Sequence, residues 1–323
     1  MRGYSMTSDY RGLAALSLLL LAGCRTQSQT LAAPVIAAPP PTAAPLVVRS
    51  SFDGDRAYAD LTAQCALGVR PPGSTGHAAC LSLIRKRLAP NVDKVVLQTF
   101  TYTDPARHVT LHLTNILGII SPNAAKKVML FTHWDTRPTA DNDLDHRDQP
   151  IMGADDGASG TAAQLELARV FHAKRPAVGV LLLFVDGEDW GPGEDKMYLG
   201  ARYFAAHPGI YKPTYAILLD MIGKKDVTIY REGRSQTWQP ELNDNVWKAA
   251  SDLGYGANFP DSVKYTIGDD HVPFHAAGIP AIDLIDFDYA YWHTLGDTAD
   301  KCSPQSLKAV GDVMAKVVGD EKP

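Results

Sequence analysis

Two short strings far apart in the chain carry the side chains best suited to metal chemistry. Glu188 and Asp189 follow the apolar run 178–185, and His293 lies beside Trp292 in a polar segment. Because adjacent side chains at the end of a strand point in different directions, one carboxylate can bind a metal while its neighbour stays free for proton transfer. An isolated Glu-Asp pair more often only solvates the end of a strand, so this interpretation depends on the residues that accompany it.

Other metal-binding side chains stand where further apolar runs end. His133 closes the run 127–132, Asp220 closes the run 215–219, and Asp156 lies in an acidic, glycine-rich turn. In an open α/β sheet, ligands bind at the edge where the carboxyl ends of the strands meet. A lone histidine is more often structural, but packing alone does not explain several such groups at successive strand ends. Since His, Asp and Glu side chains all bind zinc, the pattern predicts a zinc site.

The apolar patterns also predict the elements that must position these residues. Short apolar runs bounded by polar turns are typical of buried strands, and apolar residues at helical spacing are typical of helices that cover a sheet. We predict an α/β fold of three layers, with a mixed central β-sheet and helices on both faces. The expected strands lie near 109–118, 127–132, 179–185, 215–219 and 281–285, and the expected helices near 76–88, 161–174, 241–252 and 304–318.

The order of these residues resembles that of a known enzyme superfamily, the zinc aminopeptidase-like α/β exopeptidases. Within that superfamily the chain is most similar to the glutaminyl cyclases (glutaminyl-peptide cyclotransferases), especially bacterial ones. The resemblance covers roughly residues 52–320 and is carried by the strings HWDTRPTADND, GADDGASG, FVDGEDWG, LLDMIG, DDHVPF and YWHT, in that order.

This resemblance implies one zinc ion (Zn²⁺) per chain, with Asp156, Asp189 and His293 as its ligands. Asp156 corresponds to the ligand rather than Asp155, because the family's motif places the ligand directly before the small residue of the turn. The chain departs from the animal cyclases at Asp189, where they have glutamate. Both acids bind zinc at about 2.0 to 2.2 Å, so the shorter ligand reaches the metal only if the metal or the backbone shifts.

The resemblance also implies roles for the residues around the metal. Glu188 corresponds to the catalytic acid/base, Asp220 to the carboxylate that helps to hold the substrate amine, and Asp269 to the partner that hydrogen-bonds Asp220. Trp292 matches the tryptophan that walls the substrate pocket. Trp190 resembles a second pocket tryptophan at a shifted spacing, and packing explains it equally well.

The implied reaction converts the N-terminal glutamine of a peptide or protein to pyroglutamate and releases ammonia. The runner-up is a zinc aminopeptidase, which would use His133 and Asp220 to bind a second ion and would activate water. Trp292 and Asp269 favour the cyclase, because such peptidases generally lack this tryptophan and because Asp269 could draw Asp220 away from a second zinc. A third hypothesis, a non-catalytic cell-surface binding protein on a decayed hydrolase scaffold, is disfavoured because Glu188 and every ligand are retained.

The first residues predict where the protein acts. Arg2 and Arg11 precede the short apolar stretch 13–22, which ends in a lipobox-like Leu-Ala-Gly-Cys at Cys24. We expect a signal peptide at 1–23, a lipidated Cys24 that begins an Ala/Pro-rich tether at 24–49, and a zinc-dependent catalytic domain at 50–323. A plain cleaved signal or a weak membrane anchor is the alternative. The prediction is therefore a bacterial cell-envelope lipoprotein facing the periplasm or the exterior, and the absence of Asp after Cys24 favours the outer membrane.

Composition and the remaining polar residues complete this interpretation. Hydrophobic residues make up 45% of the chain, enough for a large core, and the formal net charge of −5 without a basic cluster argues against nucleic acid as a partner. An oxidising envelope permits a Cys65–Cys80 disulfide and would leave Cys302 reduced. Arg137 and the acidic segment 141–143 are expected to order a loop.

Overall fold

The computed structural model describes residues 50–323, which form a six-stranded mixed sheet. Its strand order is β1-β2-β4-β3-β5-β8; β1, β2 and β4 pair antiparallel, and β4, β3, β5 and β8 pair parallel. The strands are β1 (Lys94–Asp104), β2 (Val109–Ile120), β3 (Lys127–His133), β4 (Gly179–Val185), β5 (Tyr215–Asp220) and β8 (Ala281–Ile285). Two short strands, β6 (Arg231–Glu232) and β7 (Val263–Tyr265), pair separately. The predicted mixed sheet is confirmed.

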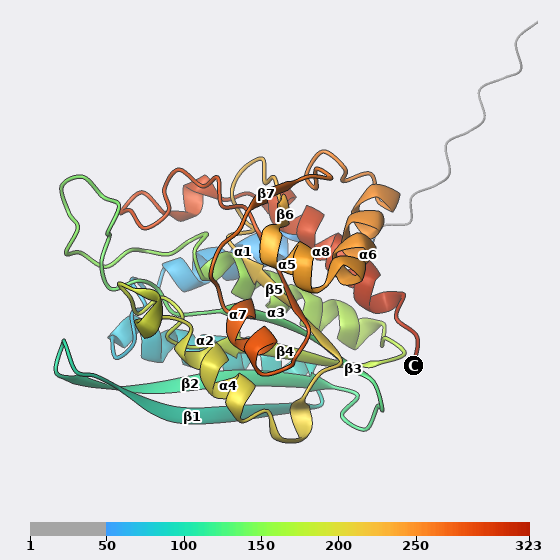
Figure 1. Cartoon of the computed structure of the whole chain (residues 1–323), viewed down its shortest axis with the longest axis horizontal. Helices are drawn as coiled ribbons and strands as arrows, with labels where there is room; N and C mark the ends of the chain where they lie inside the picture. Colours follow the sequence, from blue (N-terminus) through green and yellow to red (C-terminus); the bar gives the residue numbers. More distant parts are fainter. Residues whose placement is uncertain (1–49) are drawn as a thin grey trace, which may run out of the picture. The chain divides into compact units, whose positions relative to one another are not determined.

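Helices cover both faces of this sheet (Figure 1). In β3, Leu130 joins a core cluster with α1, α2, α3, α6 and α8, whereas Phe131 joins another with α4 and α7 and stacks on Phe274 at 4.4 Å. Because successive side chains of a strand point to opposite faces of the sheet, the strands contribute to two cores, one on each face. The three-layer fold is confirmed. The helices are α1 (Gly54–Cys65), α2 (Thr75–Leu88), α3 (Ala158–Ala173), α4 (Leu199–Ala206), α5 (Gly233–Trp238), α6 (Pro240–Asp252), α7 (His271–Ala276) and α8 (Pro304–Gly319).

Local sequence explains where several helices begin. Side-chain oxygens of Asp53, Ser74 and Ser303 accept hydrogen bonds from backbone N–H groups in the first turns of α1, α2 and α8. These residues satisfy donors that have no partner within the helix, and Pro304 occupies the first position of α8, where its missing N–H costs nothing.

The start of α3 approaches the sheet so closely that only glycine fits there. A Cβ atom at Gly160 would lie 2.2 Å from Thr132 Oγ1 and 2.3 Å from the carbonyl oxygen of Leu219. Thr132 and Leu219 precede the last residues of β3 and β5, so this contact brings the turn before α3 against the carboxyl ends of both strands. That turn contains Asp156.

The cysteine prediction is wrong in one respect: in the structure Cys65, Cys80 and Cys302 are all free thiols. Cys80 is buried in α2, and its Sγ lies 3.9 Å from Gln64 Oε1. Gln64 therefore points from α1 toward Cys80, while Cys65, the next residue, is rotated by about 100° around the helix. The reduced state expected of Cys302 agrees with the structure.

The predicted signal peptide, Cys24 and tether lie outside the described residues. Within residues 50–323, every helix is too short or too polar to span a bilayer.

Candidate active site

The candidate site lies at the edge of the sheet where the parallel strands end. His133 is the last residue of β3 and Asp220 the last of β5, and Glu188 follows the end of β4 by a short turn. Asp156 comes from the turn before α3, and His293 from the loop after β8. The structure thus brings the predicted residues together at the carboxyl edge, as an open α/β sheet leads one to expect.

Three of these residues form a buried group that suits a metal ion. One ligand atom from each of Asp156, Asp189 and His293 lies within 4.8 Å of the other two. His293 Nε2 is 3.3 Å from Asp189 Oδ1 and 3.5 Å from Asp156 Oδ2. The Oδ2 atoms of both aspartates are buried and have no hydrogen-bond partner. Buried carboxylate oxygens without a donor are costly unless they bind a cation, so this donor set fits zinc.

Asp156 also belongs to a second group of possible ligands. His133 Nε2 lies 3.1 Å from Asp156 Oδ1 and 3.2 Å from Asp220 Oδ1, and these three residues meet the same 4.8 Å criterion. Burial alone would lower the pKa of His133, but the charges of Asp220 and Asp156 raise that pKa well above its ordinary value. The two carboxylates thus favour a proton on His133.

Glu188 lies next to both groups without belonging to either. Its Oε2 is 3.9 Å from His133 Nδ1, a distance at which charges interact but no hydrogen bond forms. Burial raises the pKa of Glu188 well above its ordinary value, and the charge of Asp189 raises it further. Burial acts in the same direction on Asp189, but His293 and Arg137 outweigh it and lower the pKa of that ligand. The pKa values of these two adjacent carboxylates are therefore shifted in opposite directions. This suits Glu188 as a proton carrier and Asp189 as a ligand.

Two buried aspartates hold the backbone beneath these acidic pairs. Asp135 accepts hydrogen bonds from the backbone N–H groups of Glu188 (3.1 Å) and Asp189 (3.2 Å). Asp297 does the same for the turn before α3, accepting from Asp155 N at 2.9 Å and Asp156 N at 3.3 Å. The sequence marked Asp135 only through its place after His133, and no motif marked Asp297.

A narrow cavity of about 40 Å³ opens beside Glu188. Asp220, Asp269 and Trp292 line it together with apolar side chains that include Met221. Its volume is far below the roughly 300 Å³ at which ligand pockets for drug-sized molecules begin, so it admits only a small group. The indole of Trp292 stacks on the imidazole of His293, with ring centroids 4.0 Å apart.

Asp220 and Asp269 have different nearest partners in the structure. Asp220 pairs with His133, whereas the carboxyl of Asp269 accepts from Asp270 N at 2.6 Å and, among neighbouring charges, is influenced most strongly by that of Asp283. Burial raises the pKa of Asp269 well above its ordinary value, and the charges of Asp283 and Asp220 raise it further. The raised pKa favours a proton on Asp269, which it can share with a neighbouring carboxylate. The direct Asp269–Asp220 hydrogen bond implied by the resemblance stays a prediction.

The structure does not bring Trp190 to this cavity. Its Nε1 donates to Asp104 Oδ2 at 2.9 Å, and the guanidinium of Arg107 lies over its ring, 4.4 Å from the centroid. Trp190 packs with Leu111 and Leu199 in a small core beside β2. Packing explains this tryptophan, and no contact supports the substrate-binding role.

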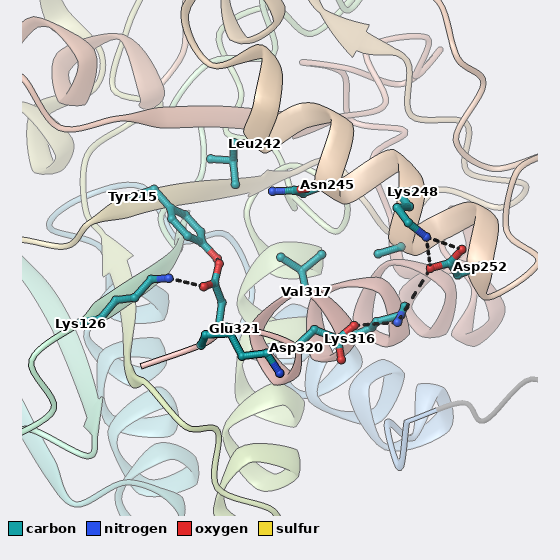
Figure 2. Close-up of a pocket in the computed structure, with 12 residues that line it drawn as sticks. Lys126, Tyr215, Leu242, Asn245, Lys248, Asp252, Lys316, Val317, Asp320 and Glu321 are labelled. Carbon is teal, nitrogen blue, oxygen red and sulfur yellow. Dashed lines mark hydrogen bonds and ion pairs between the residues drawn. The ribbon is translucent and has the colours of Figure 1, made fainter.

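A wider cavity of about 410 Å³ lies at the opposite edge of the sheet, among the start of β5, α6 and the end of α8 (Figure 2). The hydroxyl of Tyr215 donates to Glu321 at 2.7 Å, Lys126 pairs with the same carboxylate, and Lys248 pairs with Asp252 at 2.8 Å. Of the described residues that line it, none is a histidine or cysteine. Its size therefore does not make it the chemical site.

Residues 115–318 match the sequence profile of peptidase family M28, a stretch that covers more than half of the 323 residues. This chain belongs to peptidase family M28.

The proteins that this chain resembles include both cyclases and exopeptidases. The chain is 29% identical over 287 residues to the glutaminyl-peptide cyclotransferase-like protein of Mus musculus, covering 76% of this chain and 70% of that protein. A glutaminyl cyclase of Bacteroides thetaiotaomicron superposes with a TM-score of 0.82 at 36% identity, covering 85% of this chain and 100% of that one. A Zn-dependent exopeptidase of Parabacteroides distasonis superposes with a TM-score of 0.81 at 36% identity, with the same coverage. The resemblance to glutaminyl cyclases and the exopeptidase-like fold are confirmed.

Proposed function

We propose that this M28 protein is a glutaminyl-peptide cyclotransferase, which converts N-terminal glutamine to pyroglutamate and releases ammonia. The observation that carries the proposal is that Glu188 and Trp292 line one narrow cavity beside Asp156, Asp189 and His293. Relatives named glutaminyl cyclases support it. The chain also matches 100% of the length of the solved glutaminyl cyclase. The same relatives disfavour a non-catalytic binding protein.

The residues of the site suit each part of this reaction. Asp156, Asp189 and His293 would hold one zinc ion, which supplies Lewis-acid polarisation of the side-chain amide carbonyl when bound. Glu188 takes a proton from the α-amine as its nitrogen bonds to the amide carbon, and returns a proton to the nitrogen that leaves as ammonia. Trp292 and the apolar wall keep the glutamine side chain folded toward its own amine, which favours ring closure within one molecule.

A zinc aminopeptidase remains the second candidate, and one observation favours it. His133, Asp156 and Asp220 lie close enough to bind a second ion, with Asp156 shared between the two groups. Two-metal hydrolases place their ions about 3.5 to 4 Å apart and use them to activate water.

An assay on matched peptides tests the proposed reaction. We expect the zinc-loaded protein to convert a Gln-initiated peptide to the pyroglutamyl peptide with one ammonia released per turnover. Leu- and Ala-initiated peptides of the same length should stay intact, because they carry no side-chain amide for the amine to attack. Mass spectrometry detects the loss of 17 Da on cyclisation. Release of free leucine or alanine without any pyroglutamate would instead establish the aminopeptidase.

We also propose that the mature protein is attached to the cell envelope through Cys24, with 24–49 as its tether. The lipobox-like sequence that ends at Cys24 supports this proposal. Cys24→Ser should block lipid attachment and leave an unprocessed precursor. Fractionation of cells that express either form measures the effect. Wild-type and Cys24→Ser proteins that are equally soluble and equally cleaved would contradict the proposal.

A further inference from the structure

A buried arginine contacts one of the proposed zinc ligands. Arg137 is only 4% exposed, and its Nη1 donates to Asp189 Oδ1 at 2.6 Å. Its Nε donates to Asp141 Oδ2, also at 2.6 Å. The same Oδ1 lies 3.3 Å from His293 Nε2, whereas Oδ2 is buried without a hydrogen-bond partner. Arg137 therefore holds the oxygen of Asp189 that faces the histidine of the proposed zinc site.

The guanidinium has little freedom to leave this position. A Cβ atom at Gly191 would lie 2.5 Å from Nη1 and 2.6 Å from Nη2, so the backbone at Gly191 packs directly against the group. The Sδ atom of Met197 also contacts the guanidinium, 3.9 Å from Arg137 Nη1. A planar guanidinium confined in this way offers donors in fixed directions, which a flexible ammonium does not.

The segment that follows Arg137 contacts the loop of another proposed ligand. Asn142 N donates to the carbonyl oxygen of His293 at 3.1 Å, and Asn142 Nδ2 donates to that of Trp292 at 3.3 Å. Asp143 Oδ2 accepts from Leu295 N at 3.1 Å. His293 has a φ of 54°, a left-handed conformation that a residue with a side chain adopts only when its surroundings hold it.

These contacts have a common result. We propose that Arg137 is a positioning residue for zinc: it fixes the carboxylate of Asp189 beside Asp156 and His293, while the segment 137–143 ties that ligand to the loop of His293. The inference rests on the proposed zinc ligation by Asp189. It also gives a reason why an aspartate can serve where the animal cyclases have the longer glutamate, because a hydrogen-bonded partner fixes the direction of the shorter side chain.

The alternative is that Arg137 only orders its own loop through Asp141, and zinc affinity separates the two roles. We expect Arg137→Met, which keeps the length but removes the donors and the charge, to weaken zinc binding by about 10- to 100-fold. Arg137→Lys keeps the charge with a single flexible donor and should fall between Met and wild type. Competition of metal-free protein against a chromophoric zinc chelator gives the dissociation constants. Should the Met variant not fold, the Lys variant still decides, because an unchanged zinc affinity would overturn the proposal.

Arg169→Met is the matched control. Arg169 also pairs with two carboxylates, Asp60 at 2.6 Å and Glu166 at 2.7 Å, but it lies in the later turns of α3. Its replacement removes a comparable pair of ionic contacts and should leave the zinc dissociation constant unchanged. If Arg137→Met and Arg169→Met lower the melting temperature equally and neither changes zinc affinity, Arg137 is structural only.

A double-mutant cycle distinguishes failure of this inference from failure of the zinc assignment. Asp189→Ala alone should weaken zinc binding, and adding Arg137→Met should then have no further effect, because Arg137 acts through the missing carboxylate. If Asp189→Ala weakens zinc binding and Arg137→Met weakens it further by the same factor as in the wild type, the positioning role is overturned but Asp189 remains a ligand. An unchanged zinc affinity in Asp189→Ala would overturn the ligand assignment, and the role of Arg137 with it.

Discussion

Glu188→Gln should lower kcat for pyroglutamate formation by about 10² or more while the zinc content stays at the wild-type level. The amide keeps the size and most of the shape of the glutamate, but it cannot carry a proton between the attacking amine and the departing nitrogen. The three proposed ligands are untouched, so the metal remains. Ammonia release from a Gln-initiated peptide at saturating concentration, measured beside metal analysis of the same sample, tests both parts.

Glu241→Gln is the control for this substitution. Glu241 is an exposed glutamate in the first turn of α6, so the same change of charge is made away from the candidate site. Its kcat should equal that of the wild type. A Glu188→Gln protein that retains zinc and turns over at the wild-type rate would exclude Glu188 as the proton carrier, whatever the reaction proves to be.

The buried part of the fold could be predicted from the sequence, and its exposed part could not. β3, β4, β5 and β8 are buried along almost their whole length, so apolar residues dominate each of them, although Asp283 interrupts the run in β8. β1 alternates exposed and partly buried residues, with Thr and Gln among them, and it pairs only with β2 at the edge of the sheet. α1 has few large apolar residues, and part of its attachment is polar: Arg56 bonds the buried Glu166 of α3.

Some residues of the candidate site could be placed from the sequence, and others could not. Residues that follow a strand end directly, such as His133 and Asp220, could be placed at one edge because the topology of an open α/β sheet requires it. Asp297 could not, because its role depends on hydrogen bonds to a turn more than a hundred residues earlier in the chain. Trp190 shows the converse difficulty: it is close to Glu188 in sequence, but its indole points to Asp104 at the end of β1. Proximity in sequence to a catalytic residue does not fix the direction of a side chain.

Charge explains why the two groups of possible ligands need not both hold metal. The group of Asp156, Asp189 and His293 has two unpartnered carboxylate oxygens, whereas in the other group His133 already pairs with Asp156 and Asp220. These carboxylates raise the pKa of His133, so a second ion would compete with a proton for its imidazole, and it would stand close to the first ion. The geometry therefore favours occupation of the first group.

Zinc content should accordingly respond very differently to two histidine substitutions. His293→Ala removes a ligand, so zinc affinity should fall by more than the roughly 10- to 100-fold that the loss of an outer partner costs, and cyclase activity should fall with it. His133→Ala should leave one zinc per chain, although His133 is buried and the protein should become less stable. His146→Ala, an exposed histidine in a loop, serves as the control and should change neither quantity. The measurement is metal analysis of folded protein after dialysis against buffered zinc. Two tightly bound ions in the wild type, one of them lost in His133→Ala together with all activity, would contradict the single-zinc assignment and favour the aminopeptidase.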